Sequence, residues 1–186
     1  RPLIDEYISK VLDHGQFIMG PEVGQLEKQL QVFCGAKHAI AVANGTDALQ
    51  IALMAANIGQ GHVVFVPSFT YTATAEAILI LGARPIFVDV DPVTFNIDVK
   101  SLKAAIAKAR GDGLNARGII AVDLFGLPAL WDELNGIAKE NNLFLIADAA
   151  QSFGAAEASG RKVGTLAPIT TVSFFPAKPL GCFGDG

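Results

Sequence analysis

The stretch LFLIADAAQSFGA, residues 143–155, begins with five consecutive apolar residues and meets its first charge at Asp148. A continuous apolar run of strand length predicts a strand that is covered on both faces, as in a parallel sheet. Comparable runs rich in Val, Ile and Phe recur along the chain, separated by segments of helix length. They are residues 39–43, 63–67, 85–90, 118–124 and 171–175. This alternation predicts an α/β fold with three layers, α/β/α, around a mostly parallel, mixed sheet.

Local patterns also predict helices and a division of the chain. Residues 129–142 place Leu130 and Leu134 on one helical stripe. Residues 1–35 begin with an amphipathic pattern, so we expect an N-terminal helical segment there. Residues 36–186 are then expected to form a single α/β domain, or a large part of one, without repeats or linkers.

Composition excludes several classes of protein. The 186 residues include 14 Lys and Arg and 18 Asp and Glu, so the formal net charge of −4 is not that of a nucleic-acid-binding surface. No apolar stretch approaches the roughly 18 residues of a membrane span, and the N-terminus lacks the apolar core of a signal peptide. Cys34 and Cys182 have no metal-ligand spacing. These features favour a cytoplasmic protein without a metal site.

Two lone charges lie in apolar surroundings. Asp148 is the only charged side chain between Glu140 and Glu157, and Lys178 is the only ionisable side chain apart from a thiol in residues 163–184. A buried charge is unfavourable unless it is paired or neutralised. Asp148 could cap the next segment, bind a metal, or pair with a protonated ring nitrogen. Lys178 could be a surface lysine or a desolvated amine that attacks a carbonyl group.

Other strand ends supply groups that could bind a ligand. Gly45 and Thr46 follow the run at 39–43 and begin a helix, whose free amides could bind phosphate or simply form an ordinary turn. Tyr71 follows the run at 63–67 and could close the core or stack on a planar ligand. Ligands of open α/β sheets collect at the carboxyl ends of the strands. A phosphate site, an aromatic ring, a carboxylate and an amine at one such edge match pyridoxal phosphate.

The chain also resembles the DegT/DnrJ/EryC1/StrS family of nucleotide-sugar aminotransferases, which are fold-type I pyridoxal-phosphate enzymes. The resemblance implies the large domain of that fold and covers the chain almost end to end. The motifs that carry it, in order, are GPEVGQLEKQL (20–30), NGTDALQIAL (44–53), PSFTYTATAEAI (67–78), GARPIFVDVDPVTFNID (82–98), ADAAQSFGA (147–155) and SFFPAKPLGCFGDG (173–186).

The resemblance implies a role for each candidate residue. Lys178 would be the Schiff-base lysine, and Asp148 would keep the pyridine nitrogen of the cofactor protonated. Gln151 would face the ring hydroxyl, and Tyr71 would stack on the ring. The phosphate would be bound by Gly45, Thr46 and Ser173.

The resemblance implies the reaction as well. L-glutamate would give its amino group to the cofactor, and a keto-sugar linked to a nucleoside diphosphate would then receive it. Three segments are most similar to members that aminate C3 of a UDP-linked 3-keto glucuronic acid derivative, as in cell-surface polysaccharide synthesis. They are residues 14–23, 44–53 and 173–186.

The family pattern differs from this chain in three respects. An acidic residue usually precedes the pyridine-binding aspartate, where this chain has Ala147. Asp123 stands where many members have a neutral residue or His; it is the only charge between Gly118 and Trp131, and we expect it to cap the loop that follows it. Family members are homodimers and continue beyond the lysine loop into a further strand and a small C-terminal domain. We expect that domain to be absent from this chain.

Three alternative functions differ from transamination. Sugar dehydratases of the family have histidine at the position of Lys178. A dinucleotide-binding oxidoreductase would need G-x-G-x-x-G after its first strand, and NGTDAL (44–49) follows residues 39–43 here. A non-catalytic or regulatory relative that keeps the cofactor pocket stays open, because pocket residues alone do not establish turnover.

Overall fold

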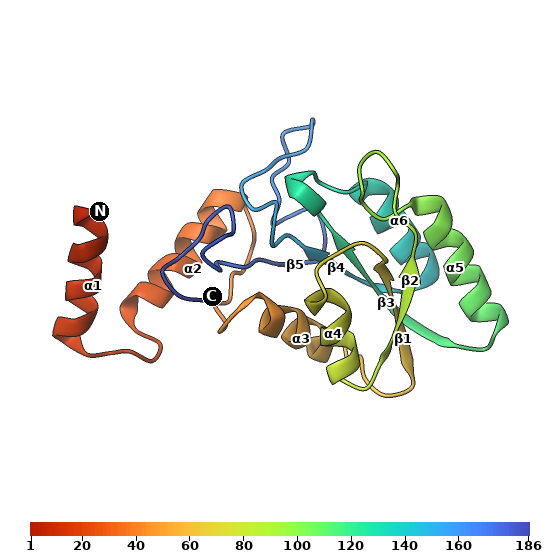
Figure 1. Cartoon of the computed structure of the whole chain (residues 1–186), viewed down its shortest axis with the longest axis horizontal. Helices are drawn as coiled ribbons and strands as arrows, with labels where there is room; N and C mark the ends of the chain where they lie inside the picture. The colour runs from red at the N-terminus through yellow and green to blue at the C-terminus, as the bar shows by residue number, and fades with distance from the viewer. The chain divides into compact units, whose positions relative to one another are not determined.

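The computed structural model describes residues 1–186, which form two compact units, residues 1–41 and 42–186. The first unit is helical and contains α1 (Pro2–His14) and α2 (Pro21–Cys34), drawn in red and orange in Figure 1. Each helix has Pro in its first turn, where the missing backbone N–H would have no intrahelical acceptor. Each helix is followed by a glycine with left-handed φ, 67° at Gly15 and 82° at Gly35.

The second unit is built on a sheet of five strands. They are β1 (His62–Pro67), β2 (Arg84–Val88), β3 (Asn115–Val122), β4 (Phe144–Asp148) and β5 (Ile169–Thr171). Their order across the sheet is β2-β1-β3-β4-β5, and every pairing is parallel. All five strands therefore end at the same edge of the sheet, which is where the predicted site residues follow them.

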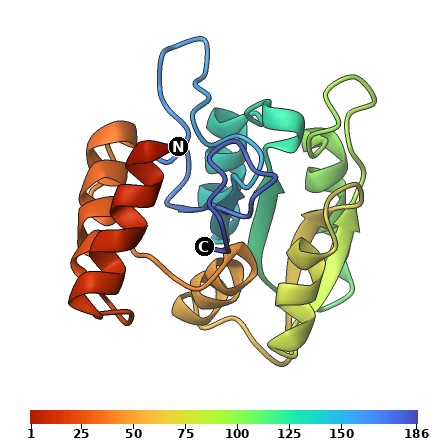
Figure 2. The same ribbon diagram turned by 60° about the vertical axis from the view of Figure 1, so that its left-hand side comes forward.

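Helices cover both faces of this sheet, as Figure 1 and Figure 2 show. One face carries α3 (Gly45–Ala55) and α4 (Ala73–Ile80), and the other carries α5 (Val99–Gly111) and α6 (Trp131–Asn141). A short 3₁₀ turn, η1 (Leu124–Gly126), follows β3. The predicted three-layer α/β/α fold is confirmed, with a sheet whose strands pair only in parallel.

Alternation along the central strands creates one core on each face. Phe65, Ile119 and Leu145 point toward α5 and α6, whereas their neighbours Val64 and Ile120 point toward α3 and α4. All these side chains are at most 2% exposed, so both faces of the central strands are buried. Burial on both faces explains why the strands read as continuous apolar runs.

Three local predictions from sequence are wrong. Residues 39–43 form no strand, because no neighbouring strand pairs with them. The strand predicted at 171–175 lies at Ile169–Thr171, where β4 provides hydrogen-bond partners. Leu130 is the N-cap of α6 and is 60% exposed, since the helix begins one residue later and Trp131 enters the core instead.

The structure contains no helix that is both long and apolar enough to cross a membrane. It also contains no group of three or more His, Cys, Asp or Glu side chains arranged to hold a metal ion.

Leu134 and Leu130 provide a matched test of the packing on α6. Leu134 is fully buried, so Leu134→Ala should lower the free energy of unfolding by about 2–5 kcal/mol. Leu130→Ala removes the same atoms from an exposed side chain and should change it by less than about 0.5 kcal/mol. Urea unfolding of the full-length protein, followed by circular dichroism, measures both. Equal losses in the two variants would contradict the assigned orientation of α6.

Candidate functional site

A cavity of about 610 Å³ lies at the carboxyl edge of the sheet. Its lining comes from residues that end or follow β1, β3, β4 and β5, together with the N-terminus of α3. All seven residues predicted as site residues line this cavity. They are Gly45, Thr46, Tyr71, Asp148, Gln151, Ser173 and Lys178. The fold therefore brings together side chains that are separated by more than half of the sequence.

The N-terminus of α3 forms one wall of the cavity. The Asn44 side chain caps the helix by accepting a hydrogen bond of 2.8 Å from the Asp47 amide. The amides of Gly45 and Thr46, which come before Asp47, have no acceptor within the helix. A Cβ on Gly45 would lie 2.8 Å from Ser173 Cβ, closer than real Cβ atoms approach one another. Only glycine at this position lets Ser173 pack against the helix N-terminus, which is a suitable arrangement for an anion.

Asp148 ends β4 and is 6% exposed. Its Oδ2 accepts a hydrogen bond of 2.9 Å from Thr74 Oγ1, and its Oδ1 accepts one of 3.2 Å from the Ala150 amide. Burial raises the pKa of Asp148, and these hydrogen bonds and the positive charge of Lys178 oppose the shift only in part. A cationic N–H group placed in the cavity would stabilise the ionised form of this carboxylate.

Lys178 and Tyr71 meet on another side of the cavity. Lys178 Nζ lies 5.9 Å from the centre of the Tyr71 ring, within the range of a cation–π contact. The Lys178 amide donates to the Phe175 carbonyl, which closes a turn just after β5. Tyr71 is 69% exposed and lines the cavity, so its side chain is accessible to a ligand.

Gln151 lies three residues beyond Asp148 and is held by a backbone group. Its Oε1 accepts a hydrogen bond of 2.8 Å from the Phe125 amide, in the η1 turn. Phe125 has a φ of 55°, an unusual value for a bulky residue. Because the carbonyl end of the Gln151 amide is engaged, the NH₂ end remains as a donor.

Asp123 is fully buried, does not line the cavity and has a different environment from Asp148. Its Oδ1 accepts hydrogen bonds from the Ala129 amide, at 2.8 Å, and from Trp131 Nε1, at 2.9 Å, while its Oδ2 accepts one from Ser152 Oγ, at 2.8 Å. Burial raises the pKa of Asp123, and these three hydrogen bonds oppose the shift. Asp123 caps the loop after β3, as expected, and ties it to the residue after Gln151.

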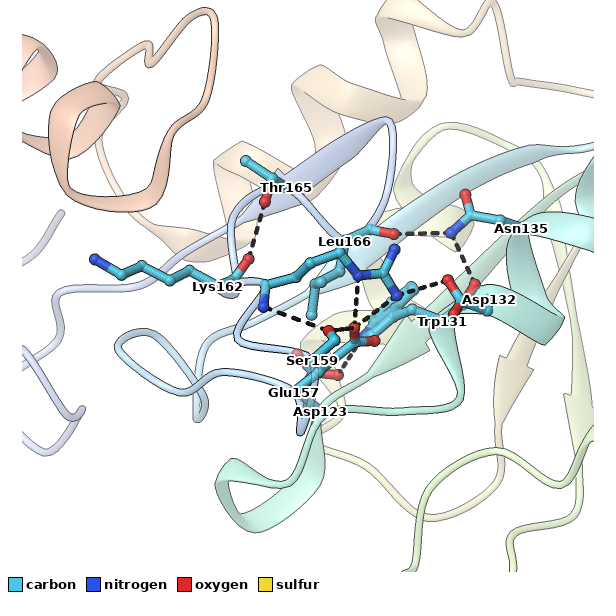
Figure 3. Close-up of polar contacts among 10 residues, drawn as sticks. Asp123, Trp131, Asp132, Asn135, Glu157, Ser159, Lys162, Thr165 and Leu166 are labelled. Carbon is cyan, nitrogen blue, oxygen red and sulfur yellow. Dashed lines mark hydrogen bonds and ion pairs between the residues drawn. The ribbon is translucent and has the colours of Figure 1, made fainter.

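A separate ionic cluster lies at the surface near α6. Asp132 and Glu157, both labelled in Figure 3, each form an ion pair with the guanidinium group of Arg161, with a shortest separation of 2.6 Å. The cluster joins the turn at 157–161 to the first turn of α6 and contributes no residue to the cavity. Exposed ion pairs contribute little to stability, so we assign it a local structural role.

Two buried polar residues near the site were missed from the sequence. Thr74 is 1% exposed and bonds Asp148, while Asn96 is 5% exposed and bonds the backbone of the η1 turn. Both lie within motifs shared with the family, at 67–78 and 82–98, but nothing local distinguishes them from surface Thr and Asn residues. Their partners are distant in sequence, and only the folded chain reveals them.

The chain is similar in sequence to curated sugar aminotransferases. The chain is 50% identical over 183 residues to the UDP-2-acetamido-2-deoxy-3-oxo-D-glucuronate aminotransferase of Pseudomonas aeruginosa, covering 98% of this chain and 49% of that protein. It therefore spans about half the length of such curated relatives.

The chain is also similar to solved structures of aminotransferases and related proteins. The crystal structure of a DegT DnrJ EryC1 StrS aminotransferase from Brucella abortus has a TM-score of 0.96 at 51% identity, covering 98% of this chain and 49% of that one. The crystal structure of ntda from Bacillus subtilis, with bound cofactor PMP, has a TM-score of 0.88 at 34% identity, covering 98% and 39%. The model of the DegT/DnrJ/EryC1/StrS aminotransferase family matches residues 2–186, and the chain belongs to this family.

Proposed function

We propose that this chain provides the cofactor-binding part of a pyridoxal-phosphate-dependent aminotransferase that acts on nucleotide-linked keto-sugars. The observation that carries the proposal is the convergence of Lys178, Asp148 and the Gly45–Ser173 contact on one cavity. An amine, a buried carboxylate and an anion site are the three groups that pyridoxal phosphate requires. The similar structure of ntda from Bacillus subtilis, which has PMP bound, supports a cofactor of this kind.

In this proposal, residues around the cavity would contact each polar group of the cofactor. The free amides of Gly45 and Thr46 and the hydroxyl of Ser173 would bind the phosphate. The Gln151 NH₂ group would donate to the ring hydroxyl, because its oxygen is already bonded to Phe125. When bound, pyridoxal phosphate supplies an aldehyde that condenses with amines and a ring that withdraws electrons from the attached carbon.

Asp148 and Lys178 would carry the proton chemistry. The Asp148 carboxylate would hold a proton on the ring nitrogen, and that positive charge would in turn stabilise the ionised carboxylate in its buried position. Lys178 Nζ would hold the cofactor in the resting state and, once free as an amine, would accept a proton and return it to a neighbouring atom. Tyr71 would limit the movement of the ring.

The nature of the substrates is a further part of the proposal. The 50% identity to an aminotransferase named for a UDP-linked 3-oxo glucuronate supports a 3-keto sugar of that class. The family resemblance supports L-glutamate as the amino donor, a homodimeric assembly and a cytoplasmic location. The product would serve the synthesis of cell-surface polysaccharide.

Replacing Lys178 tests the function directly. In the full-length protein, pyridoxal phosphate should give an absorbance band that shifts when L-glutamate is added, and reduction with borohydride should attach the cofactor mass to the peptide containing Lys178. Lys178→Arg keeps the charge but not the nucleophilic amine, so it should lose both signals and lower turnover on the order of a thousandfold or more. Turnover of glutamate with a nucleotide keto-sugar separates an enzyme from a non-catalytic cofactor-binding protein. Undiminished turnover in Lys178→Arg would refute the assignment.

Replacing Asp148 tests the energetic cost of its buried charge. Burial raises the pKa of Asp148, so the folded protein binds this proton more tightly than the unfolded chain, and stability falls as pH rises from about 4 through the raised pKa. Asp148→Asn should therefore raise the thermal midpoint of the cofactor-free protein at pH 7, with a difference that vanishes below about pH 4.

The same thermal midpoints should also be measured with pyridoxal phosphate added. The wild-type protein should gain more stability from the cofactor than Asp148→Asn does, because the variant should bind it at least about tenfold more weakly. A cofactor-free variant that is less stable than wild type at pH 7 would contradict the sign assigned to the Asp148 charge.

Replacing Gly45 tests the anion site. In Gly45→Ala the new methyl group collides with Ser173 Cβ, so the affinity for pyridoxal phosphate should fall by about tenfold or more. Gly136→Ala is the matched control, since Gly136 lies within α6 with nothing within 4 Å of its added Cβ. That control should bind the cofactor normally and be more stable by about 0.5–1 kcal/mol. Equal affinities in all three proteins, measured by absorbance titration, would exclude this anion site.

A further inference from the structure

Asn96 joins two distant parts of the chain without lining the cavity. It lies in the turn between β2 and α5 and is 5% exposed. Its Oδ1 accepts a hydrogen bond of 3.0 Å from the Leu124 amide, and its Nδ2 donates one of 2.9 Å to the Leu127 carbonyl. A single side chain thus spans both ends of the η1 turn.

The turn that contains Asn96 is itself fixed. The Asp91 amide donates to the Asn96 carbonyl at 2.9 Å, and Asp91 Oδ1 accepts hydrogen bonds from the amides of Val93 and Thr94. The backbone of Asn96 is therefore held independently of its side chain. Its amide group can then act as a rigid clamp on η1.

The η1 turn adopts a backbone conformation that needs such a clamp. Phe125 has a φ of 55°, a value that bulky residues adopt rarely and only where the surroundings impose it. Gly126 follows with a φ of 86°, and a Cβ added there would lie 3.3 Å from the Gln151 carbonyl oxygen. This pair of left-handed residues brings the turn against Gln151 and directs the Phe125 amide at Gln151 Oε1, 2.8 Å away.

This contact determines which end of the Gln151 amide faces the cavity. If the amide were reversed, its NH₂ group would oppose the N–H of Phe125, and two donors would meet. With Oε1 engaged, the NH₂ group is the end that is available to a ligand. A donor at this position suits a phenolic or anionic oxygen and does not suit a protonated donor group.

We infer that Asn96 is a positioning residue for the cofactor site: by holding the η1 turn, it directs the Phe125 amide at Gln151 and thereby presents Gln151 as a hydrogen-bond donor to an oxygen of the ligand. The inference rests on the proposed function for the identity of that ligand. It assigns a role to the motif at 82–98, which contributes no residue to the cavity lining.

The test uses the full-length protein and a double-mutant cycle on cofactor affinity. Asn96→Ala and Gln151→Ala should each weaken pyridoxal phosphate binding by roughly five- to tenfold, the effect of one lost hydrogen bond. Because Asn96 acts through Gln151, the double variant should bind no more weakly than Gln151→Ala alone. Losses that multiply in the double variant would overturn the inference.

Asn135→Ala is the matched control. The Asn135 side chain also links two backbone segments, donating to the carbonyls of Trp131 at 2.7 Å and Leu166 at 2.8 Å (Figure 3), but it bonds neither η1 nor Gln151. Its loss should lower thermal stability while changing cofactor affinity by less than about twofold. An equal loss of affinity in Asn135→Ala would mean that general destabilisation causes the effect, which would also overturn the inference.

Hydrogen exchange in the cofactor-free protein gives a second readout that needs no ligand. Asn96→Ala should speed exchange of the Phe125 amide roughly five- to tenfold relative to wild type, and Asn135→Ala should leave that rate unchanged. If the wild-type protein binds no pyridoxal phosphate, the proposed function fails, and this rate alone decides whether Asn96 positions Gln151. An unchanged Phe125 rate in Asn96→Ala would overturn the positioning role.

Discussion

The Asp148 carboxylate is buried at the end of β4, an interior strand of a sheet whose strands all run in one direction. A parallel sheet has helices on both faces, and its ligands bind at the carboxyl ends of the strands, where the following loops carry polar groups. Desolvation raises the pKa of this carboxyl, and groups from neighbouring elements lower it in part. Thr74 of α4 bonds it directly, and the positive charge of Lys178 acts on it from beyond β5.

Asp123 and Asp148 are both buried carboxylates, but the chain supplies them with different numbers of hydrogen-bond donors. Asp123 receives three hydrogen bonds from the chain, one of them from an indole, and is absent from the cavity wall. Asp148 receives two and lines the cavity. An ionised carboxylate can accept about four hydrogen bonds, so Asp148, which lines the cavity, keeps more unused capacity than Asp123 does. The number of donors supplied by the chain distinguishes the two roles better than burial does.

Most of the fold, and the residues that line the cavity, could be predicted from the sequence, because their signals are local. Continuous apolar runs indicated the strands, and a lone charge in an apolar stretch drew attention to Asp148 and to Lys178. The strand expected at 39–43 failed because strand formation depends on a neighbour as well as on composition. Asn96 and Thr74 could not be found, since their importance lies in contacts with residues about 30 and 74 positions away, respectively. The family resemblance supplied Gln151, and the structure supplied the reason for its orientation.

The contact between Gly45 and Ser173 joins the two ends of the unit formed by residues 42–186. Gly45 begins the first helix of residues 42–186, and Ser173 follows the last strand, so the proposed anion site forms only after the two ends of this unit have come together. Such a non-local contact is slow to form and is readily lost in partial unfolding. A ligand that binds there stabilises only the fully closed form, by about 2.7 kcal/mol at a hundred times its dissociation constant. The supply of such a ligand would in this way affect the lifetime of the folded unit in the cell.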